Sequence, residues 1–323
     1  MARKWLVTGA AGFIGSNVCT DLLGRGCRVV GIDNFSTGKR QNSDRLSAGH
    51  SDLFEFVEGD IRDRDAMEKV LQGVDVVVHL AAQVSVQKSI DDPLDTDLTN
   101  VNGTLNVLDI AGKFGVGTFI YASSCAVYGN NEALPLSETE IPEPMSPYAV
   151  SKLSNEHYAG VVTSLYPPMT TTGLRFFNIF GPWQDPSGGY AAVIPKWIDL
   201  CLSDTQPVMY GDGSATRDFC CVGNVAEAIW QIAEQAEPLP HGVYNIGTSV
   251  STSLNELFDG IVSALSSRDV RLTFNGPDRK PWKTGDILHS YSDVSRARND
   301  FGFNPKISLS DGIDLLLATE YNR

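Results

Sequence analysis

The first half of the chain alternates short apolar runs with amphipathic stretches. Runs rich in Val, Ile and Phe predict strands, and stretches with apolar residues three or four positions apart predict helices. The expected strands cover 5–8, 28–33, 54–58, 75–81, 118–123 and 173–180. The expected helices lie near 13–24, 63–72, 94–113 and 147–165. This alternation is typical of a parallel sheet whose strands are joined by crossover helices.

Two of these strands indicate the fold class. The runs VDVVVHLAA (74–82) and GTFIYASS (117–124) are apolar on both faces of the strand. Strands of this kind belong to parallel sheets that helices cover on each side. We therefore expect an α/β protein with a doubly wound parallel sheet of the Rossmann type and a smaller α/β domain.

The composition of the chain changes after about Asn178. Gly, Pro and Trp interrupt the sequence, and the helices expected there lie near 191–203, 223–236, 253–267 and 309–319. We expect the sheet domain to cover 1–177, with returning segments near 213–245, and the second domain to cover 178–323. The second domain should lie over the carboxyl edge of the sheet, where open α/β sheets bind ligands.

Charge and cysteine content exclude several classes of protein. The 323 residues carry 25 Lys and Arg against 39 Asp and Glu, a net charge of −14. Such an acidic surface argues against nucleic-acid and membrane-surface partners. The six cysteines form no C-x-x-C pair and no cluster with metal-ligand spacing, which predicts a cytoplasmic protein without a metal site. No apolar run approaches the roughly 18 residues of a membrane helix.

A glycine-rich turn follows the first strand. Gly9, Gly12 and Gly15 are spaced G-x-x-G-x-x-G, and Phe13 and Ile14 open the next helix. Gly9 permits a tight turn, Gly12 lets a pyrophosphate approach the backbone, and Gly15 lets the helix pack closely on the strand. The helix N-terminus then offers unpaired N–H groups to phosphate. A plain strand–turn–helix connection also explains the spacing, so this interpretation depends on its context.

The context favours a dinucleotide. Asp33 ends the second strand, where a carboxylate accepts hydrogen bonds from ribose hydroxyls and repels a 2′-phosphate. NAD is therefore favoured over NADP, although Lys39 and Arg40 lie nearby and leave NADP open. Further cofactor contacts are expected where the third and fourth strands end, at Asp60, Ile61, Ala81, Ala82 and Gln83.

The segment Tyr148-Ala-Val-Ser-Lys152 carries the candidate chemistry. Ser146 and Pro147 precede it as a plausible helix start, so Tyr148 and Lys152 share one helical face. A nearby ammonium is expected to lower the pKa of the phenol and make it a usable acid or base. A core tyrosine with a surface lysine is the alternative. Hydroxyls at the end of the fifth strand should face the same cleft and orient a substrate, namely those of Ser123 and Ser124.

Together these residues resemble the extended short-chain dehydrogenase/reductases that act on nucleotide sugars. The resemblance covers nearly the whole chain and includes DNFSTG (33–38), YASSCAVYG (121–129), SPYAVSK (146–152), LRFFNIFGP (174–182) and YGDGSATRDF (210–219). The most similar subgroup is that of UDP-N-acetylglucosamine 4-epimerases, through QDPSGGYAAVIPKWI (184–198) and GDILHSYSDVSRA (285–297). The resemblance implies bound NAD, a UDP-sugar substrate and a homodimer formed by helices 94–113 and 147–165.

The resemblance also assigns roles to individual positions. It implies that Asn178 and Gln184 contact the diphosphate and sugar, that Arg217 binds the uridine ribose or phosphate, and that Ser290 leaves room for a 2-acetamido group. It adds Asn34, Asn100, Ser123, Tyr148 and Lys152 as cofactor contacts. Further substrate positions that it implies are Ser85, Asn100, Ala192, Lys283 and Asp286. In the implied reaction, NAD takes hydride from C4 of the sugar while Tyr148 takes the O4 proton, and hydride returns to the other face of the keto sugar.

The sequence departs from the family pattern at four positions. Cys125 stands where the epimerases commonly carry Ser, and is either an inert thiol or a reactive one. Ala126 stands where related dehydratases carry a Glu base, and Lys283 replaces an Arg on the diphosphate. Val84 replaces a commonly smaller residue near the sugar. UDP-Glc and UDP-Gal stay open as additional substrates. Three alternatives also stay open: a UDP-glucuronate 4-epimerase, a nucleotide-sugar dehydratase or decarboxylase, and a non-catalytic NAD-binding regulator.

Overall fold

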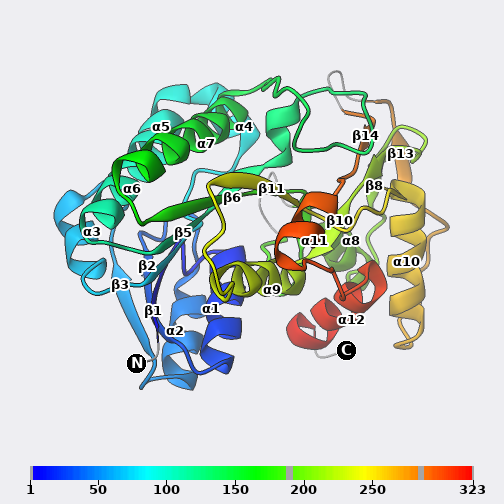
Figure 1. The fold of residues 1–323 in the computed structure, drawn as a ribbon. Helices are drawn as coiled ribbons and strands as arrows, with labels where there is room; N and C mark the ends of the chain where they lie inside the picture. Colours follow the sequence, from blue (N-terminus) through cyan, green and yellow to red (C-terminus); the bar gives the residue numbers. More distant parts are fainter. Residues whose placement is uncertain (1–2, 187–191, 283–286, 322–323) are drawn as a thin grey trace.

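A computed structural model describes residues 3–186, 192–282 and 287–321. Its main strands are β1 (Lys4–Thr8), β2 (Arg28–Asp33), β3 (Phe54–Glu58), β4 (Val76–His79), β5 (Thr118–Ser124), β6 (Thr170–Phe176) and β11 (Gly242–Ile246). They form one seven-stranded parallel sheet in the order β11-β6-β5-β4-β1-β2-β3 (Figure 1). The predicted doubly wound parallel sheet is confirmed.

Helices cover both faces of this sheet (Figure 1). One face packs against α1 (Phe13–Gly24), α2 (Arg40–Gly49), α9 (Val222–Ala233) and α11 (Ser295–Phe301). The other packs against α3 (Arg64–Val70), α6 (Gly103–Lys113) and α7 (Pro147–Leu165). The central strands β1, β2, β4 and β5 bury apolar side chains on both sides, so their sequences show continuous rather than alternating apolar runs.

A second core lies beside the sheet. It is shared by α8 (Val193–Leu202), α10 (Leu254–Ser266) and α12 (Leu309–Glu320). Short strands complete this region: β7 (Asn178–Phe180), β8 (Val208–Tyr210), β9 (Thr216–Arg217), β10 (Phe219–Cys221), β12 (Thr252–Ser253), β13 (Asp278–Lys280) and β14 (His289–Ser290). They form three small sheets, β10-β7, β12-β9-β14 and β13-β8.

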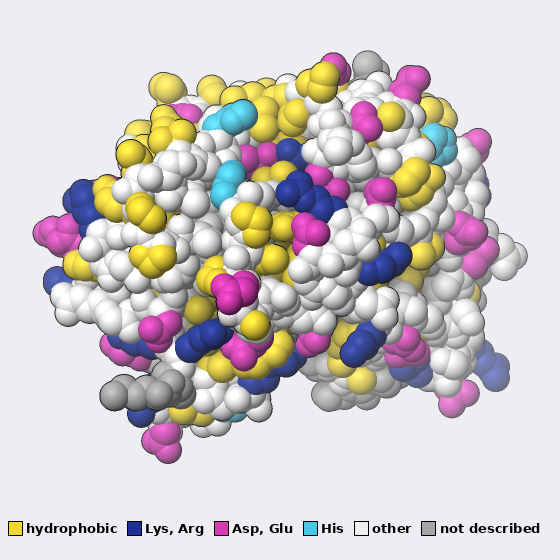
Figure 2. All heavy atoms as spheres, in the orientation of Figure 1, with side chains coloured by type: hydrophobic (Ala, Val, Ile, Leu, Met, Phe, Trp, Pro, Cys, Tyr) yellow, Lys and Arg dark blue, Asp and Glu magenta, His cyan; other side chains and the backbone are white. Residues whose placement is uncertain are grey.

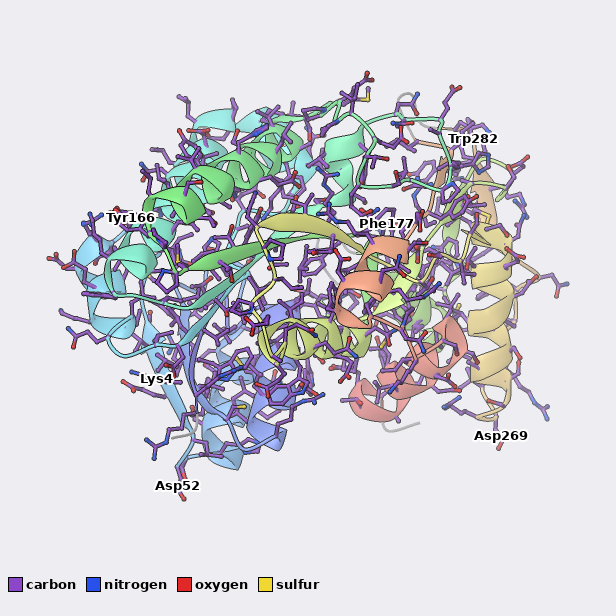
Figure 3. The ribbon with its side chains drawn as sticks, in the orientation of Figure 1. Lys4, Asp52, Tyr166, Phe177, Asp269 and Trp282 are labelled. Carbon is purple, nitrogen blue, oxygen red and sulfur yellow. The ribbon has the colours of Figure 1, made fainter. Side chains whose placement is uncertain are left out.

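The strand expected over 173–180 is divided in two. The backbone N–H of Phe177 donates to Ile246 on β11, whereas the N–H of Asn178 donates to Asp218 beside β10. The chain therefore changes partners between β6 and β7 and leaves the main sheet at Phe177, which Figure 3 labels at this passage. The apolar run continues through the break, so the sequence alone predicts one strand.

The helix expected over 94–113 is helical throughout but irregular. It consists of α5 (Pro93–Asp97), a π-helical turn (Leu98–Asn102) and α6. The sequence did not predict α2, α4 (Val86–Asp91), α11 or β11, because these elements are short or carry few apolar residues. None of the helices within the described ranges is long and apolar enough to cross a bilayer.

Candidate active site

The glycine-rich turn joins β1 to α1. Gly9 has a φ of +71°, and a Cβ there would lie 2.9 Å from the backbone nitrogen of Ala81. A Cβ on Gly15 would lie only 2.0 Å from the carbonyl oxygen of Gly9. Gly12 caps α1 in an extended conformation without a side-chain hydrogen bond, so the first N–H groups, including those of Phe13 and Ile14, have no side-chain cap. This uncapped N-terminus fits a pyrophosphate.

The Asp33 carboxylate lies at the carboxyl end of β2, the strand next to β1. It accepts hydrogen bonds from the N–H groups of Ala11 (3.0 Å) and Phe35 (2.8 Å). Burial raises the pKa of Asp33, and the backbone hydrogen bonds oppose that shift. Nearby, Lys39 pairs with Asp185 at 3.3 Å and Arg40 pairs with Glu58 at 2.9 Å. Because both cations face carboxylates, the arrangement favours a ribose hydroxyl beside Asp33 over a 2′-phosphate.

The ends of β2 and β3 bring Asn34, Asp60 and Ile61 together. The Asn34 side-chain amide donates to the Asp60 carboxylate at 2.8 Å. A bidentate contact with Arg62 lowers the pKa of Asp60 to about 2. Ile61 is buried, and a Cβ on Gly103 would lie 2.7 Å from its Cδ1. The pocket edge here is therefore charged on one side and apolar on the other.

The end of β4 is held by buried polar side chains. The Thr8 hydroxyl accepts from the N–H of Ala81 at 3.2 Å and contacts His79 Nδ1 at 2.8 Å. Asn100, fully buried in the π-helical turn, accepts from the N–H of Gln83 at 2.7 Å and donates to its carbonyl at 2.9 Å. Asn100 thus fixes the backbone of the segment after β4. Ala82 is partly exposed beside Gln83, and Ser85 caps α4.

Tyr148, Lys152 and Ser124 converge at the end of β5. Ser146 caps α7 and Pro147 occupies its first turn, as the sequence predicts. Lys152 is 4% exposed, its Nζ donates to the Ala122 carbonyl at 3.0 Å, and it lies 5.8 Å from the Tyr148 ring centroid. The Ser124 hydroxyl accepts from the N–H of Ala126 at 3.2 Å.

The pKa values of this group differ from the sequence-based expectation. Burial raises the pKa of Tyr148 to about 12, and a hydrogen bond with Ser124 only partly opposes that shift. Burial lowers the pKa of Lys152 to about 8. The expected lowering of the phenol pKa by Lys152 is therefore wrong for this arrangement. The physical reason is that desolvation disfavours the charged form of both groups, and the ammonium is directed at a carbonyl.

Ser123 and Cys125 flank Ser124. The Ser123 hydroxyl is turned into the protein and donates to Glu156 at 2.5 Å. The expectation that this hydroxyl faces the cleft and orients a substrate is therefore wrong, because its hydrogen-bond partner lies in the core. Burial raises the pKa of Cys125 to about 12, while the charge of Arg217 opposes that shift. The Cys125 thiol is therefore protonated at neutral pH, which favours the inert over the reactive interpretation.

The described substrate candidates that follow β6 in the chain lie on or beside the short strands and helices around the second core. Arg217 on β9 lies opposite Ser290 on β14, and its guanidinium donates to the carbonyls of Ile287 (2.7 Å) and Leu288 (3.1 Å). Its positive charge opposes the rise in the pKa of Cys125, which follows β5 in the chain. Asn178 begins β7, Gln184 donates to the Ile179 carbonyl at 3.2 Å, and Ala192 caps α8. Lys283 and Asp286 lie outside the described residues.

The structure thus gathers the candidate residues in three groups. The cofactor candidates lie at the carboxyl ends of β1 to β4, the reactive trio lies at β5 and α7, and Arg217 lies on β9 opposite Ser290. Sequence reasoning missed the buried residues that hold these groups, since their partners lie far away in the chain: Thr8, His79, Ser151, Glu156 and Asp218. Within the described ranges, no three His, Cys, Asp or Glu side chains are grouped as metal ligands.

Comparison with known proteins places this geometry in a family. Residues 5–247 match the model of the NAD dependent epimerase/dehydratase family. The UDP-glucose 4-epimerase of Mycolicibacterium smegmatis is 38% identical over 313 residues, 96% of each chain. The Thermotoga maritima UDP-glucose 4-epimerase with UDP-glucose is 35% identical, with a TM-score of 0.89 over 99% of each chain.

A further solved structure carries a different sugar. The UDP-N-acetylglucosamine 4-epimerase from Methanobrevibacter ruminantium, in complex with UDP-N-acetylmuramic acid, is 35% identical, with a TM-score of 0.88 over 98% of this chain and 99% of that one. The matches extend over nearly the whole chain. The chain therefore belongs to the NAD dependent epimerase/dehydratase family.

Proposed function

We propose that the protein is an NAD-dependent UDP-sugar 4-epimerase whose preferred substrates are UDP-GlcNAc and UDP-GalNAc. One observation carries the proposal: Tyr148 and Lys152 on α7 meet Ser124 at the carboxyl end of β5, on the sheet edge where the glycine turn also opens. The enzyme is an isomerase, since hydride removed from C4 returns to C4.

NAD, when bound, supplies the acceptor and donor of that hydride. The uncapped N-terminus of α1 would hold its pyrophosphate, and Asp33 would accept the ribose hydroxyls. Gly9 and Gly15 permit the tight turn that this requires, because a Cβ at either position would collide with protein backbone. We propose that Asn34, Asp60, Ile61, Ala81, Ala82, Gln83 and Asn100 complete this pocket through side-chain or backbone contacts. Ser123 would contribute only its backbone, because its hydroxyl donates to Glu156.

Proton transfer is the task of α7. Tyr148 is neutral at pH 7 because burial raises its pKa to about 12. The phenol first passes its proton to the neutral amine form of Lys152, and the resulting phenolate takes the O4 proton as a base. The phenol formed in that step then returns the proton to the keto oxygen as an acid. Lys152, with a pKa of about 8, is the group beside it that exchanges a proton near neutral pH. Ser124 orients the substrate oxygen toward the phenol.

The UDP moiety is assigned to the second region. Arg217 offers a planar fork that matches phosphate oxygens, and its place beside Ser290 brings the diphosphate and the sugar end together. No donor within the described part of the chain reaches the buried Oε1 of Gln184, which suits an acceptor for a sugar hydroxyl. Asn178, Ser85, Cys125, Ala192, Lys283 and Asp286 are proposed as the remaining substrate positions.

The preference for an N-acetylated sugar rests on Ser290. A small side chain on β14, directly opposite Arg217, leaves space for a 2-acetamido group, and Ser290 is only partly exposed. We propose that each domain binds one ligand. Residues 1–177, with the returning segments near 213–245, would bind NAD, and residues 178–323 would bind the nucleotide sugar.

We propose a homodimer through the helical segments 94–113 and 147–165, with α4 beside them. Hydrophobic side chains gather along the upper part of the face drawn in Figure 2, over these helices. Several are more than half exposed, among them Leu94 (76%), Leu165 (65%) and Val161 (57%). Burying such a patch against a second copy would remove it from water. Sedimentation of the protein and of a Val161→Lys/Leu165→Lys variant tests this, since the variant should be a monomer. We also propose a cytoplasmic location, in line with the six free cysteines.

The proposed reaction is tested by incubating the purified protein with UDP-GlcNAc, UDP-Glc and UDP-GlcA without added reductant. NMR then reads the C4 configuration of the sugar, and mass spectrometry reads the product mass. Inversion of UDP-GlcNAc at unchanged mass is expected. Inversion of UDP-GlcA alone would reassign the substrate, and loss of water or carbon dioxide would replace epimerisation by dehydration or decarboxylation.

Tyr148→Phe separates an enzyme from an NAD-binding regulator. The variant should retain NAD, because the phenol oxygen is not part of the pyrophosphate or adenosine sites, and should lose about 10²- to 10⁴-fold in turnover. No interconversion of any of the three sugars by the wild type would defeat the proposed function.

A further inference from the structure

A buried ion pair lies directly behind the reactive group. Glu156 on α7 and Arg175 on β6 form two hydrogen bonds, of 2.9 Å to Nε and 2.7 Å to Nη2 of the guanidinium. Their side chains are only 7% and 4% exposed. Neither residue reaches the surface, and neither is used in the proton transfer described above.

The ion pair is tied to the strand that carries Ser124. In the ladder between β5 and β6, Ser123 lies directly opposite Arg175. The Ser123 hydroxyl donates to the same carboxylate oxygen, Glu156 Oε1, at 2.5 Å. Glu156 therefore joins two adjacent strands to the helix through one carboxylate, at the residue immediately before Ser124.

The same helix face carries the reactive residues. Tyr148, Lys152 and Glu156 are spaced four residues apart on α7, so they lie in one row. Lys152 Nζ donates to the Ala122 carbonyl at 3.0 Å, and Ser123 donates to Glu156. Two neighbouring residues of β5 are thus held by two successive turns of α7, which sets the distance between Ser124 and Tyr148.

Arg175 also supports the chain on the other side of Ser124. Its guanidinium lies 4.8 Å from the ring centroid of Tyr128, the last residue of the 3₁₀ helix Cys125–Tyr128. The Tyr128 hydroxyl donates to Asn245 on β11 at 2.7 Å. The segments before and after Ser124 are therefore both anchored to this ion pair.

We propose that Glu156, together with Ser123 and Arg175, is a positioning residue that sets the distance and orientation between Ser124 on β5 and Tyr148 on α7. The inference rests on the proposed function, because it concerns the residues that perform the epimerisation. The Glu156 side chain contacts neither the substrate nor the cofactor. Its substitution should therefore slow the chemical step and leave the binding of both intact.

Two variants and a control test the proposal. Glu156→Gln keeps the shape of the side chain but turns an amide donor toward the guanidinium. Ser123→Ala removes only the tie to β5 and leaves the ion pair in place. Thr163→Val is the matched control, since Thr163 also links α7 to β6, through the Thr171 hydroxyl at 2.7 Å, two turns beyond Glu156.

The expected result is a separation of kcat from binding. Glu156→Gln and Ser123→Ala should lower kcat by about 10- to 100-fold, as a misplacement of about 1 Å does, while KM for the UDP-sugar and the bound NAD stay within about twofold. Thr163→Val should keep the wild-type kcat. If Glu156→Gln does not fold, Ser123→Ala decides, because it leaves no charge unpaired.

Two results would overturn the proposal. One is a Ser123→Ala variant with wild-type kcat; the other is a folded Glu156→Gln variant that loses thermal stability but not kcat, which would make the pair purely structural. If the wild type epimerises none of the sugars, the proposed function fails, and a crystal structure of Ser123→Ala decides the positioning role. The proposal expects Lys152 to leave the Ala122 carbonyl and Ser124 to leave Tyr148 in that structure, and an unchanged arrangement refutes it.

Discussion

Substitution of Gly15 by Ala probes the cofactor site most sharply. The added methyl carbon would lie 2.0 Å from the Gly9 carbonyl oxygen and 2.7 Å from its carbonyl carbon. Ordinary contacts of this kind exceed about 3 Å, so the start of α1 must move by about 1 Å away from the turn. Both colliding groups are backbone, so neither can turn aside as a flexible side chain would. The expected cost is about 1–3 kcal/mol of folding stability.

The same displacement should weaken NAD binding. The N–H groups at the start of α1 would move by about 1 Å from the pyrophosphate, and each charge-assisted hydrogen bond lost costs about 1.5–3 kcal/mol. One such bond corresponds to a roughly 10- to 100-fold weaker Kd. Gly24→Ala is the matched control, because it lies at the last residue of the same helix and its Cβ meets nothing within 4 Å.

The assay compares both variants with the wild type. Chromatography of the nucleotide released on denaturation measures copurified NAD, calorimetric titration measures Kd, and thermal unfolding measures stability. Gly24→Ala should bind NAD normally and gain up to about 1 kcal/mol, since alanine is the better helix former. The reasoning is refuted if Gly15→Ala matches Gly24→Ala in NAD content and stability.

Three further predictions concern the reactive group and the substrate side. Because the pKa of Lys152 is about 8 in the folded state and about 10.5 when unfolded, the folded state disfavours its charge by about 3 kcal/mol at pH 7, and this penalty disappears as the pH rises from 8 to 10.5. Denaturant titrations should therefore show the wild type gaining stability across that window and Lys152→Met failing to gain it; parallel curves would contradict the shift. The Cys125 thiol, with a pKa of about 12, should react with iodoacetamide at pH 7.5 on the order of 10³-fold more slowly than an ordinary cysteine, and rapid labelling of its peptide by mass spectrometry would reject the inert assignment. Arg217→Met should raise KM for the UDP-sugar by about 10-fold or more, by loss of a charge-assisted contact, and leave copurified NAD unchanged; an unaltered KM would remove Arg217 from the diphosphate site.

The elements that position the site follow from local sequence. Ser146 and Pro147 specify the start of α7, and the observed helix Pro147–Leu165 has the predicted bounds. The strand over 28–33 also matches, because its continuous apolar run ends at Asp33, and the strand over 54–58 matches although Glu55 interrupts its apolar residues. The glycine spacing predicts the turn, since only residues without a Cβ fit beside the backbone of Gly9 and Ala81.

The remainder depends on partners distant in the chain. The break between β6 and β7 depends on Asp218, whose carbonyl accepts from Asn178, and no feature of 173–180 indicates it. The Asp218 carboxylate is itself buried among hydroxyls and N–H groups of Thr248, Ser249 and Ser292. The raised pKa of Tyr148 also depends on residues distant in the chain, since they bury the phenol. The spacing on the helix predicts that Lys152 is a neighbour, but it does not predict that solvent is excluded around the phenol.

The fate of the hydrogen on C4 shows whether inversion proceeds by hydride transfer away from C4 and back to C4. A UDP-hexose labelled with deuterium at C4 is incubated with the purified protein in ordinary water, and the label and configuration at C4 are read by NMR and mass spectrometry. We expect the inverted product to keep its deuterium at C4, because hydride leaves and returns within one site. Inversion with replacement of the label by solvent hydrogen, or no inversion at all, would contradict it.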